Sequence, residues 1–147
     1  MAAGVTEPLY TRDILRLAAS IPHLARFDGV DGPEVRSPTC GARMRATVVL
    51  DGEGRVTSLN QAVEACAFGQ AAAALVGAHA IGRDAAEVRA ALIATERWLA
   101  GVEDVEPWRG FAALEPARHR QGRHGAILLP FRALLAAIDA TAGKAGR

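Results

Sequence analysis

The sequence predicts an α+β fold made of an N-terminal helix, a small antiparallel sheet of about three strands, and later helices packed on one face of that sheet. Three patterns indicate it: an amphipathic segment near the N-terminus, a strong hairpin pattern, and a series of helical stretches after the hairpin. The chain has 147 residues, 50% of them hydrophobic, which is enough to bury one core. We therefore expect a single domain over residues 1–147, with its core between about residues 10 and 140.

The segment before the hairpin predicts one helix and one edge strand. From Tyr10 to Ser20 apolar residues recur on one face of a helix, and Pro22 ends the pattern. That face comprises Ile14, Leu15, Leu17 and Ala18. From Leu24 to Pro38, short apolar pieces such as Leu24 to Phe27 lie among Gly, Asp and Pro, which suits an edge strand followed by a turn.

The hairpin is the clearest local signal. Apolar and polar residues alternate up to Leu50, Asp51 to Gly54 supplies a turn, and a second strand follows from Arg55 to Glu64. The alternation predicts that the buried face carries Met44, Ala46, Val48 and Leu50.

Helical patterns dominate the remainder of the chain. Asp84 as N-cap with Glu87 three residues later predicts a capped helix start, and Gly101 marks its end. Pro130 suits only the first turn of a helix, so the last helix is expected to begin at or after His124. In order, we expect helices over Ala67 to Ala80, Asp84 to Leu99 and His124 to Ala140, with one or two helical turns in Trp108 to Leu114, a polar basic loop over Glu115 to Gly122 and a frayed tail from Ala142 to Arg147.

Charge and composition exclude several classes of function. Seventeen basic and sixteen acidic residues leave a formal charge of +1, which favours neither nucleic acid nor an anionic membrane as a partner. Met1 to Tyr10 lacks the pattern of a signal peptide, and the weakly polar stretch Ala67 to Gly82 is too short to cross a bilayer, so we expect a cytoplasmic protein. In a reducing compartment the two cysteines are free thiols, metal ligands or redox groups rather than a structural disulfide.

Cys40, Cys66 and His124 are the candidate chemical groups. Cys40 lies in a turn where Gly41 frees the backbone and leaves the thiol accessible. Cys66 stands before a helix, whose unpaired N–H groups favour a thiolate, although a small buried cysteine is the simpler interpretation there. His124, at the mouth of the last helix, is by itself an ordinary helix-end residue, and the basic cluster Arg118 to Arg123 before it is typical of a solvated loop.

The order of these motifs resembles that of the U-type iron–sulfur cluster scaffolds, the family of IscU, SufU and the NifU N-terminal domain, from Tyr10 to Ile138. The resemblance implies a SufE/NifU-like fold and rests on three segments. Pro38-Thr39-Cys40-Gly41 resembles the family's ligand turn Pro-x-Cys-Gly-Asp, and Glu64-Ala65-Cys66-Ala67 resembles its Gly-Cys-Ala junction. Leu114 to Leu128 resembles the stretch that carries a His and a third Cys.

The resemblance implies a metal site formed by Cys40, Cys66 and His124, together with a cysteine desulfurase as partner. Ala42 replaces the family's Asp in what reads as a polar turn, and Gly125 replaces its third Cys. Three candidate ligands remain, whereas an iron–sulfur cluster needs four. The fourth ligand must then come from solvent, a small thiol, a partner or another residue such as His119. The implied cofactor is a transient iron–sulfur cluster or zinc, or none if the site is empty.

Four functions stay open at this point. The first is a non-enzymatic scaffold-like protein that binds a cluster or metal ion transiently and passes it to downstream acceptor proteins. The second is a zinc-bound acceptor of persulfide sulfur, with Cys66 or Cys40 as the acceptor thiol. The third is an interaction module that kept the fold without a metal. The fourth is a redox switch between the two cysteines, which requires their Cα atoms to lie within about 7 Å.

Overall fold

The structure, a computed structural model, describes residues 10–38 and 40–145. It has the predicted α+β architecture: an antiparallel sheet in the order β1-β2-β3, with the long helices on one face. In chain order the elements are α1 (Arg12–Ala18), the 3-10 helix η2 (Phe27–Gly29), β1 (Glu34–Arg36), β2 (Arg43–Leu50), β3 (Val56–Glu64), α2 (Ala67–Ala78), α3 (Ala85–Leu99), the 3-10 helices η3 (Phe111–His119) and η4 (Gln121–Arg123), and α4 (His124–Ala145).

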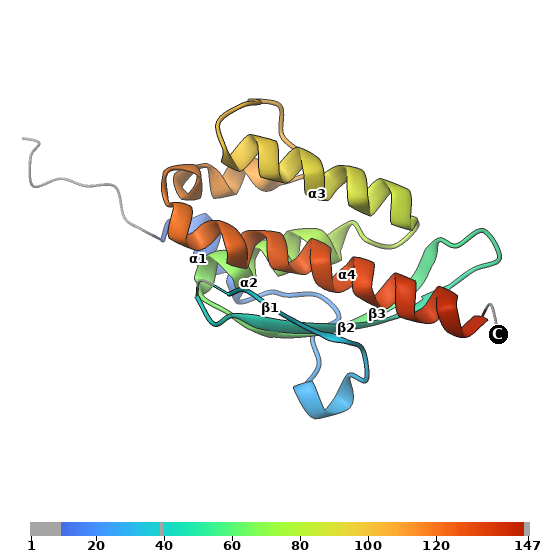
Figure 1. The fold of residues 1–147 in the computed structure, drawn as a ribbon. Coiled ribbons are helices and arrows are strands. Elements are labelled where there is room, and N and C mark those ends of the chain that lie inside the picture. Colours follow the sequence, from blue (N-terminus) through green and yellow to red (C-terminus); the bar gives the residue numbers. More distant parts are fainter. Residues whose placement is uncertain (1–9, 39, 146–147) are drawn as a thin grey trace, which may run out of the picture.

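The molecule is layered. Helix α4 crosses the sheet beside α2, and α3 forms an outer layer over them, while η2 lies on the opposite face of the sheet (Figure 1). The hairpin forms as predicted, with Met44, Ala46 and Val48 buried under the helices. Leu50, predicted on the same face, is only partly buried, just beyond Val49 where the strand register shifts. Alternating side chains of a strand point to opposite faces, so Arg43 and Arg45 point away from the helices, and both guanidiniums lie over the ring of Phe27 in η2.

The N-terminal segment follows the prediction except at Leu15. Helix α1 buries Ile14, but Leu15 is 51% exposed because a seven-residue helix presents only a narrow face to its neighbours. An edge strand forms within Leu24 to Pro38, as predicted: it is β1, while Leu24 to Phe27 contributes only an isolated bridge between Leu24 and Gln61 before η2. Pairing to β2 fixes the edge strand, and local apolar content does not reveal that pairing.

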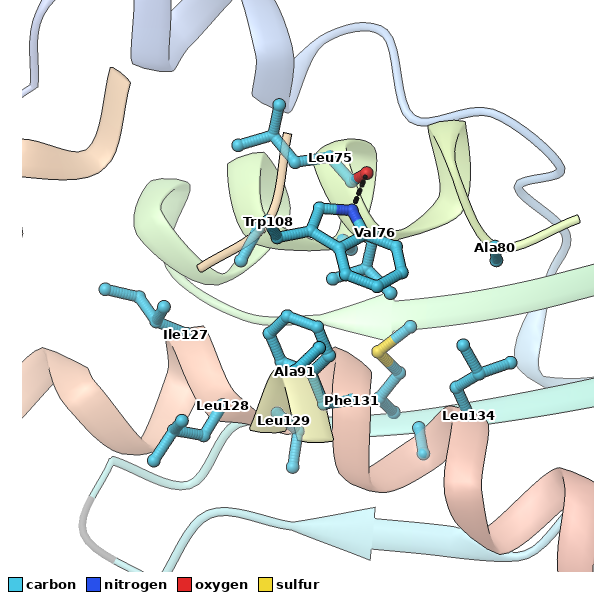
Figure 2. Close-up of a cluster of buried hydrophobic side chains, with 14 of the residues drawn as sticks. Leu75, Val76, Ala80, Ala91, Trp108, Ile127, Leu128, Leu129, Phe131 and Leu134 are labelled. Atoms are coloured by element: carbon cyan, nitrogen blue, oxygen red, sulfur yellow. Dashed lines mark hydrogen bonds between the residues drawn. The ribbon is translucent and has the colours of Figure 1, made fainter. Parts of the chain in front are cut away.

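A buried tryptophan joins the end of α2 to the core. The backbone N–H of His79, the C-cap residue, donates to the carbonyl of Val76 instead of the carbonyl of Leu75. The indole Nε1 of Trp108 donates to that Leu75 carbonyl at 2.8 Å (Figure 2). The indole also packs edge to face against Phe131 of α4, with 5.4 Å between ring centroids, so one side chain connects the α3–η3 loop, α2 and α4.

Helix α4 begins at His124 and continues to Ala145, five residues past the expected end at Ala140; residues 146–147 lie outside the described part of the chain. Pro130 is therefore inside the helix, contrary to the expectation that it marks the first turn. Its missing N–H frees the carbonyl of Ala126, which lies 3.3 Å from where a Cβ on Gly69 would be. The helix thus tolerates the proline at a point where α2 lies close to it.

The apolar helix α4 is longer than α2, which lies in the weakly polar stretch Ala67 to Gly82. Among the described residues, 121–143 is the one helical stretch long and apolar enough to span a bilayer. More than half of it is buried against the sheet, α2 and α3, and its apolar residues belong to the core shown in Figure 2. Its composition is that of a central core helix.

Polar loops after α3 are more ordered than the sequence predicts. Glu115 to Gly122, expected to be an irregular basic loop, is mostly 3-10 helix. Leu114 and Ala117, both in η3, are fully buried. Apolar side chains spaced three residues apart match the three-residue turn of a 3-10 helix. Charged residues surround them in the sequence, so the segment looks like a polar loop.

Candidate functional site

The turn that holds Cys40 connects β1 to β2 at one end of the sheet. The N–H of Ser37 donates to the carbonyl of Ala42 at 2.8 Å, and the N–H of Gly41 donates to the carbonyl of Ser37 at 3.2 Å. Gly41 has φ +70°, a positive value that glycine adopts without strain, in agreement with the unusual backbone conformation expected at this position. Cys40 is exposed, while Thr39, part of the same motif, lies outside the described residues.

Cys66 is the N-cap residue of α2, directly after β3, as predicted. It is half-buried and packs against the core, so it is less accessible than the exposed Cys40. Its carbonyl accepts a hydrogen bond from the N–H of Gln70 at 2.9 Å, and the Gln70 side chain donates to the carbonyl of Ala65, also at 2.9 Å. These contacts fix the backbone at the strand-to-helix junction that presents the thiol.

His124 is the first residue of α4, and its ring is held by backbone carbonyls. Its Nε2 atom lies 3.0 Å from the carbonyl of Ala117 and 3.1 Å from that of Arg118. Carbonyl oxygens only accept, so Nε2 must carry the proton and donate. In the neutral form of the ring, the lone pair is then on Nδ1, the nitrogen that remains for a metal ion.

All three candidate residues belong to the same end of the fold. The pairing of Arg43 with Glu64 places the turn of Cys40 and the junction of Cys66 next to each other beyond the paired strands. Gly69, in the first turn of α2, faces Ala126, in the first turn of α4, and this brings the starts of both helices together. Figure 1 shows the start of α4 at the end of the sheet opposite the β2–β3 turn.

The shared location is not a preformed metal site. Within residues 10–38 and 40–145, no three His, Cys, Asp or Glu side chains are grouped closely enough to hold a metal ion. The donor types fit zinc or an iron–sulfur cluster, but the donors are three in number and are not gathered into one coordination sphere. Binding would require a rearrangement of this end of the fold or ligands from elsewhere.

The carboxylates of Glu34 and Glu64, near the candidate site, form ion pairs with arginines. Arg43 bonds Glu64 at 2.5 Å and Glu34 at 2.9 Å, and its guanidinium lies 3.9 Å from the ring centroid of Phe27. The hydrogen bond from Arg43 holds the pKa of Glu64 below its usual value, and those from Arg36 and Arg43 do the same for Glu34. Sequence reasoning missed this network, although opposite charges at Arg43 and Glu64, on facing strands of a predicted hairpin, were a usable signal.

Two further residues near the site differ from expectation. Ala42, at the position of the family's Asp, is only 4% exposed and belongs to the core instead of a polar turn. Arg118, assigned to a solvated loop, has a side chain only 12% exposed. Gly125 lies in the first turn of α4 and is not among the described glycines with positive φ, so a side chain there is compatible with the backbone.

Known structures share this fold over almost its whole length. The chain is 29% identical to the N-terminal part of a nitrogen-fixing NifU-like protein from Brucella abortus, with a TM-score of 0.79 over 92% of this chain and 96% of that one. The chain thus has the fold that its resemblance to the U-type scaffolds implies. A putative iron–sulfur cluster assembly scaffold protein for the SUF system from Fervidobacterium islandicum shares the fold at 18% identity, with a TM-score of 0.69 over 88% of this chain and 96% of that one.

A third solved structure, of a hypothetical protein, shares the fold at 22% identity, with a TM-score of 0.65 over 89% of this chain and 97% of that one. No protein-family model matches the sequence, and no curated protein matches it either. The likeness to the U-type scaffolds therefore rests on the comparison of three-dimensional structures.

Proposed function

We propose that this protein is a scaffold-like protein of iron–sulfur cluster assembly that binds a cluster, or a metal ion, transiently through Cys40, Cys66 and His124. The observation that carries the proposal is the likeness to the NifU-like protein, combined with the place of all three residues at one end of the shared fold. The cluster is cargo in this role, to be passed on to acceptor proteins, and the protein performs no turnover of its own.

The ligand arrangement supports loose rather than permanent binding. Thiolates and imidazole are acceptable ligands of both iron–sulfur clusters and zinc. Three dispersed donors hold a metal less tightly than a closed set of four, because part of the binding energy is used to bring the donors together. Loose binding suits a protein that must release its cargo in a cytoplasmic assembly pathway.

A second function is favoured by the exposure of Cys40. An accessible thiolate can attack the outer sulfur of a persulfide on a cysteine desulfurase. A new S–S bond forms on Cys40, the S–S bond of the desulfurase breaks, and its cysteine leaves as a thiolate, with no net oxidation. Zinc would then serve to hold Cys66 and His124, and the same desulfurase is the partner in both functions.

Anaerobic reconstitution with ferrous iron and sulfide tests the first function. We expect the parent to retain iron and acid-labile sulfide after gel filtration, and Cys40→Ser, Cys66→Ser and His124→Ala each to lower the amount retained. His79→Gln is the control, since it removes an imidazole at the opposite end of α2 from Cys66. Equal retention in all five proteins would contradict the assigned ligands.

Desulfurase turnover separates the two functions. Zinc binding together with faster desulfurase turnover, lost in Cys40→Ser, would favour the persulfide acceptor over the scaffold. Normal folding with neither metal binding nor an effect on the desulfurase would leave the interaction module as the remaining function.

A further inference from the structure

The carbonyls that hold His124 belong to one short segment whose position is fixed from two sides. The side chain of Ala117 is fully buried in the core, and its carbonyl also accepts the N–H of Arg120 at 3.0 Å. The next residue, Arg118, carries the second carbonyl that His124 contacts. Whatever fixes the backbone of residues 117–118 therefore fixes the direction of the imidazole.

Arg118 makes an unusually complete set of contacts for a residue in a charged segment. Its Nε donates to the carbonyl of Trp98 at 2.8 Å, and its Nη2 donates to the carbonyl of Glu103 at 3.0 Å and to the carboxylate of Asp104 at 3.1 Å. Its Nη1 lies 3.3 Å from a carboxylate oxygen of Glu115. The guanidinium also lies over the Trp98 ring, 4.9 Å from the ring centroid.

These contacts differ from those of a surface ion pair. Two of the acceptors are backbone carbonyls, from the end of α3 and from the following loop, and the Arg118 side chain is 12% exposed. Surface pairs of flexible side chains contribute little, but a guanidinium fork bonded to several fixed acceptors holds one geometry. Arg118 thus joins the end of α3, the loop after it and η3 into one unit.

We infer that Arg118 is a positioning residue for His124: by fixing the carbonyls of residues 117 and 118, it keeps Nε2 of the imidazole occupied as a donor and leaves Nδ1 as the nitrogen available to a ligand. Metal-binding histidines are commonly oriented in this way, by donating the N–H of the ring nitrogen that does not bind the metal to a backbone carbonyl. The inference rests on the proposed role of His124 as a ligand, but the orientation of the ring can be measured without any metal.

The test compares Arg118→Ala with Arg120→Ala in the metal-free protein. Arg120 is exposed and lies two residues away, so its removal deletes the same charge from the same segment without breaking the set of contacts. In the parent we expect a His124 Nε2–H proton that is protected from exchange with water and visible by nuclear magnetic resonance. We expect that protection to be lost in Arg118→Ala and kept in Arg120→Ala.

Zinc titration of the same proteins supplies the second readout. Removing an outer partner of a ligand typically weakens metal binding by about 10-fold to 100-fold, and we expect a loss of this size for Arg118→Ala only. If Arg118→Ala does not fold, Arg118→Lys takes its place in both measurements. The lysine ammonium keeps the charge but cannot reproduce the fork of donors of the guanidinium.

The outcomes distinguish this inference from the proposed function. Unchanged protection of the ring proton in the folded Arg118 variant would overturn the inference, whatever the zinc affinity. If His124→Ala binds zinc as tightly as the parent, the ligand role of His124 fails, and the ring proton alone decides whether Arg118 positions the imidazole. Loss of protection together with weaker zinc binding supports both.

Discussion

Substituting Gly77 by alanine should destabilise the protein through a single buried side chain. A Cβ at this position in α2 would lie 2.5 Å from Nε2 of Gln61 and 3.1 Å from Cγ of Pro22. Gln61 is 1% exposed, and its Nε2 donates to the carbonyls of Pro22 at 2.8 Å and Ala73 at 3.2 Å. The new methyl group must displace this amide, because it is the closest obstacle.

The expected loss follows from three terms. A buried donor left without its partners costs about 1–3 kcal/mol. Overpacking a core costs about 1–3 kcal/mol, and replacing glycine by alanine in a helix recovers about 1 kcal/mol. The free energy of unfolding should therefore fall by about 3 kcal/mol. With an unfolding entropy of about 2.1 cal/mol/K per residue over 147 residues, this lowers the melting temperature by about 10 °C.

A double-mutant cycle measured by thermal and urea unfolding identifies the cause. In the Gln61→Ala background the displaced amide is gone, so the Gly77→Ala substitution should lose most of its penalty, with a coupling of about 1–3 kcal/mol. Gly143→Ala in α4 is the control, since a Cβ there meets nothing within 4 Å and should leave stability unchanged or slightly raised. A Gly77→Ala protein that melts at or above the parent, or a penalty undiminished without Gln61, would refute the reasoning.

Three other predictions concern the end of the fold that carries the candidate site. Gly69→Ala would place a Cβ 2.7 Å from that of Ala65 and 3.2 Å from that of Ala126 in α4, so it should shift the start of α2 and weaken zinc binding. Ala65→Gly in the same protein removes the closer contact and should restore part of the binding; unaltered binding in the single variant contradicts this. Gly125→Cys should add a fourth ligand and raise the melting temperature measured in zinc above that measured in chelator. At a zinc concentration 100 times Kd, the stabilisation by bound zinc is about 2.7 kcal/mol. If the variant gains no more stability from zinc than the parent does, the ligand positions are wrong. The hydrogen bond from Arg43 lowers the pKa of Glu64 in the folded protein. This ion pair therefore stabilises the fold at pH values above the ordinary carboxyl pKa, and the stabilisation is lost as the pH falls through the lowered pKa. Arg43→Gln should therefore reduce the difference between the unfolding free energies at neutral pH and below about pH 4, and an equal difference in both proteins would contradict the assignment.

Local sequence determined the elements whose signals are local. The β2–β3 hairpin follows from alternation around a four-residue turn, and the start of α3 follows from Asp84, whose side chain accepts the N–H of Glu87 at 2.9 Å in a complete capping box. The position of Cys66 before α2 and the positive φ of Gly41 are also properties of neighbouring residues in the chain. The order of these motifs was enough to indicate the family.

Tertiary structure decided what depends on partners distant in sequence. Pro130 is accepted inside α4, with the carbonyl that it frees facing Gly69 of α2. Ala42 is buried because the helices cover its end of β2, and Arg118 is ordered because three separate segments supply its acceptors. The shared location of Cys40, Cys66 and His124 likewise depends on strand register and on the approach of α2 to α4. A side chain's residue type fixes its chemistry, but its neighbours across the fold decide whether it is buried, bonded or free to bind.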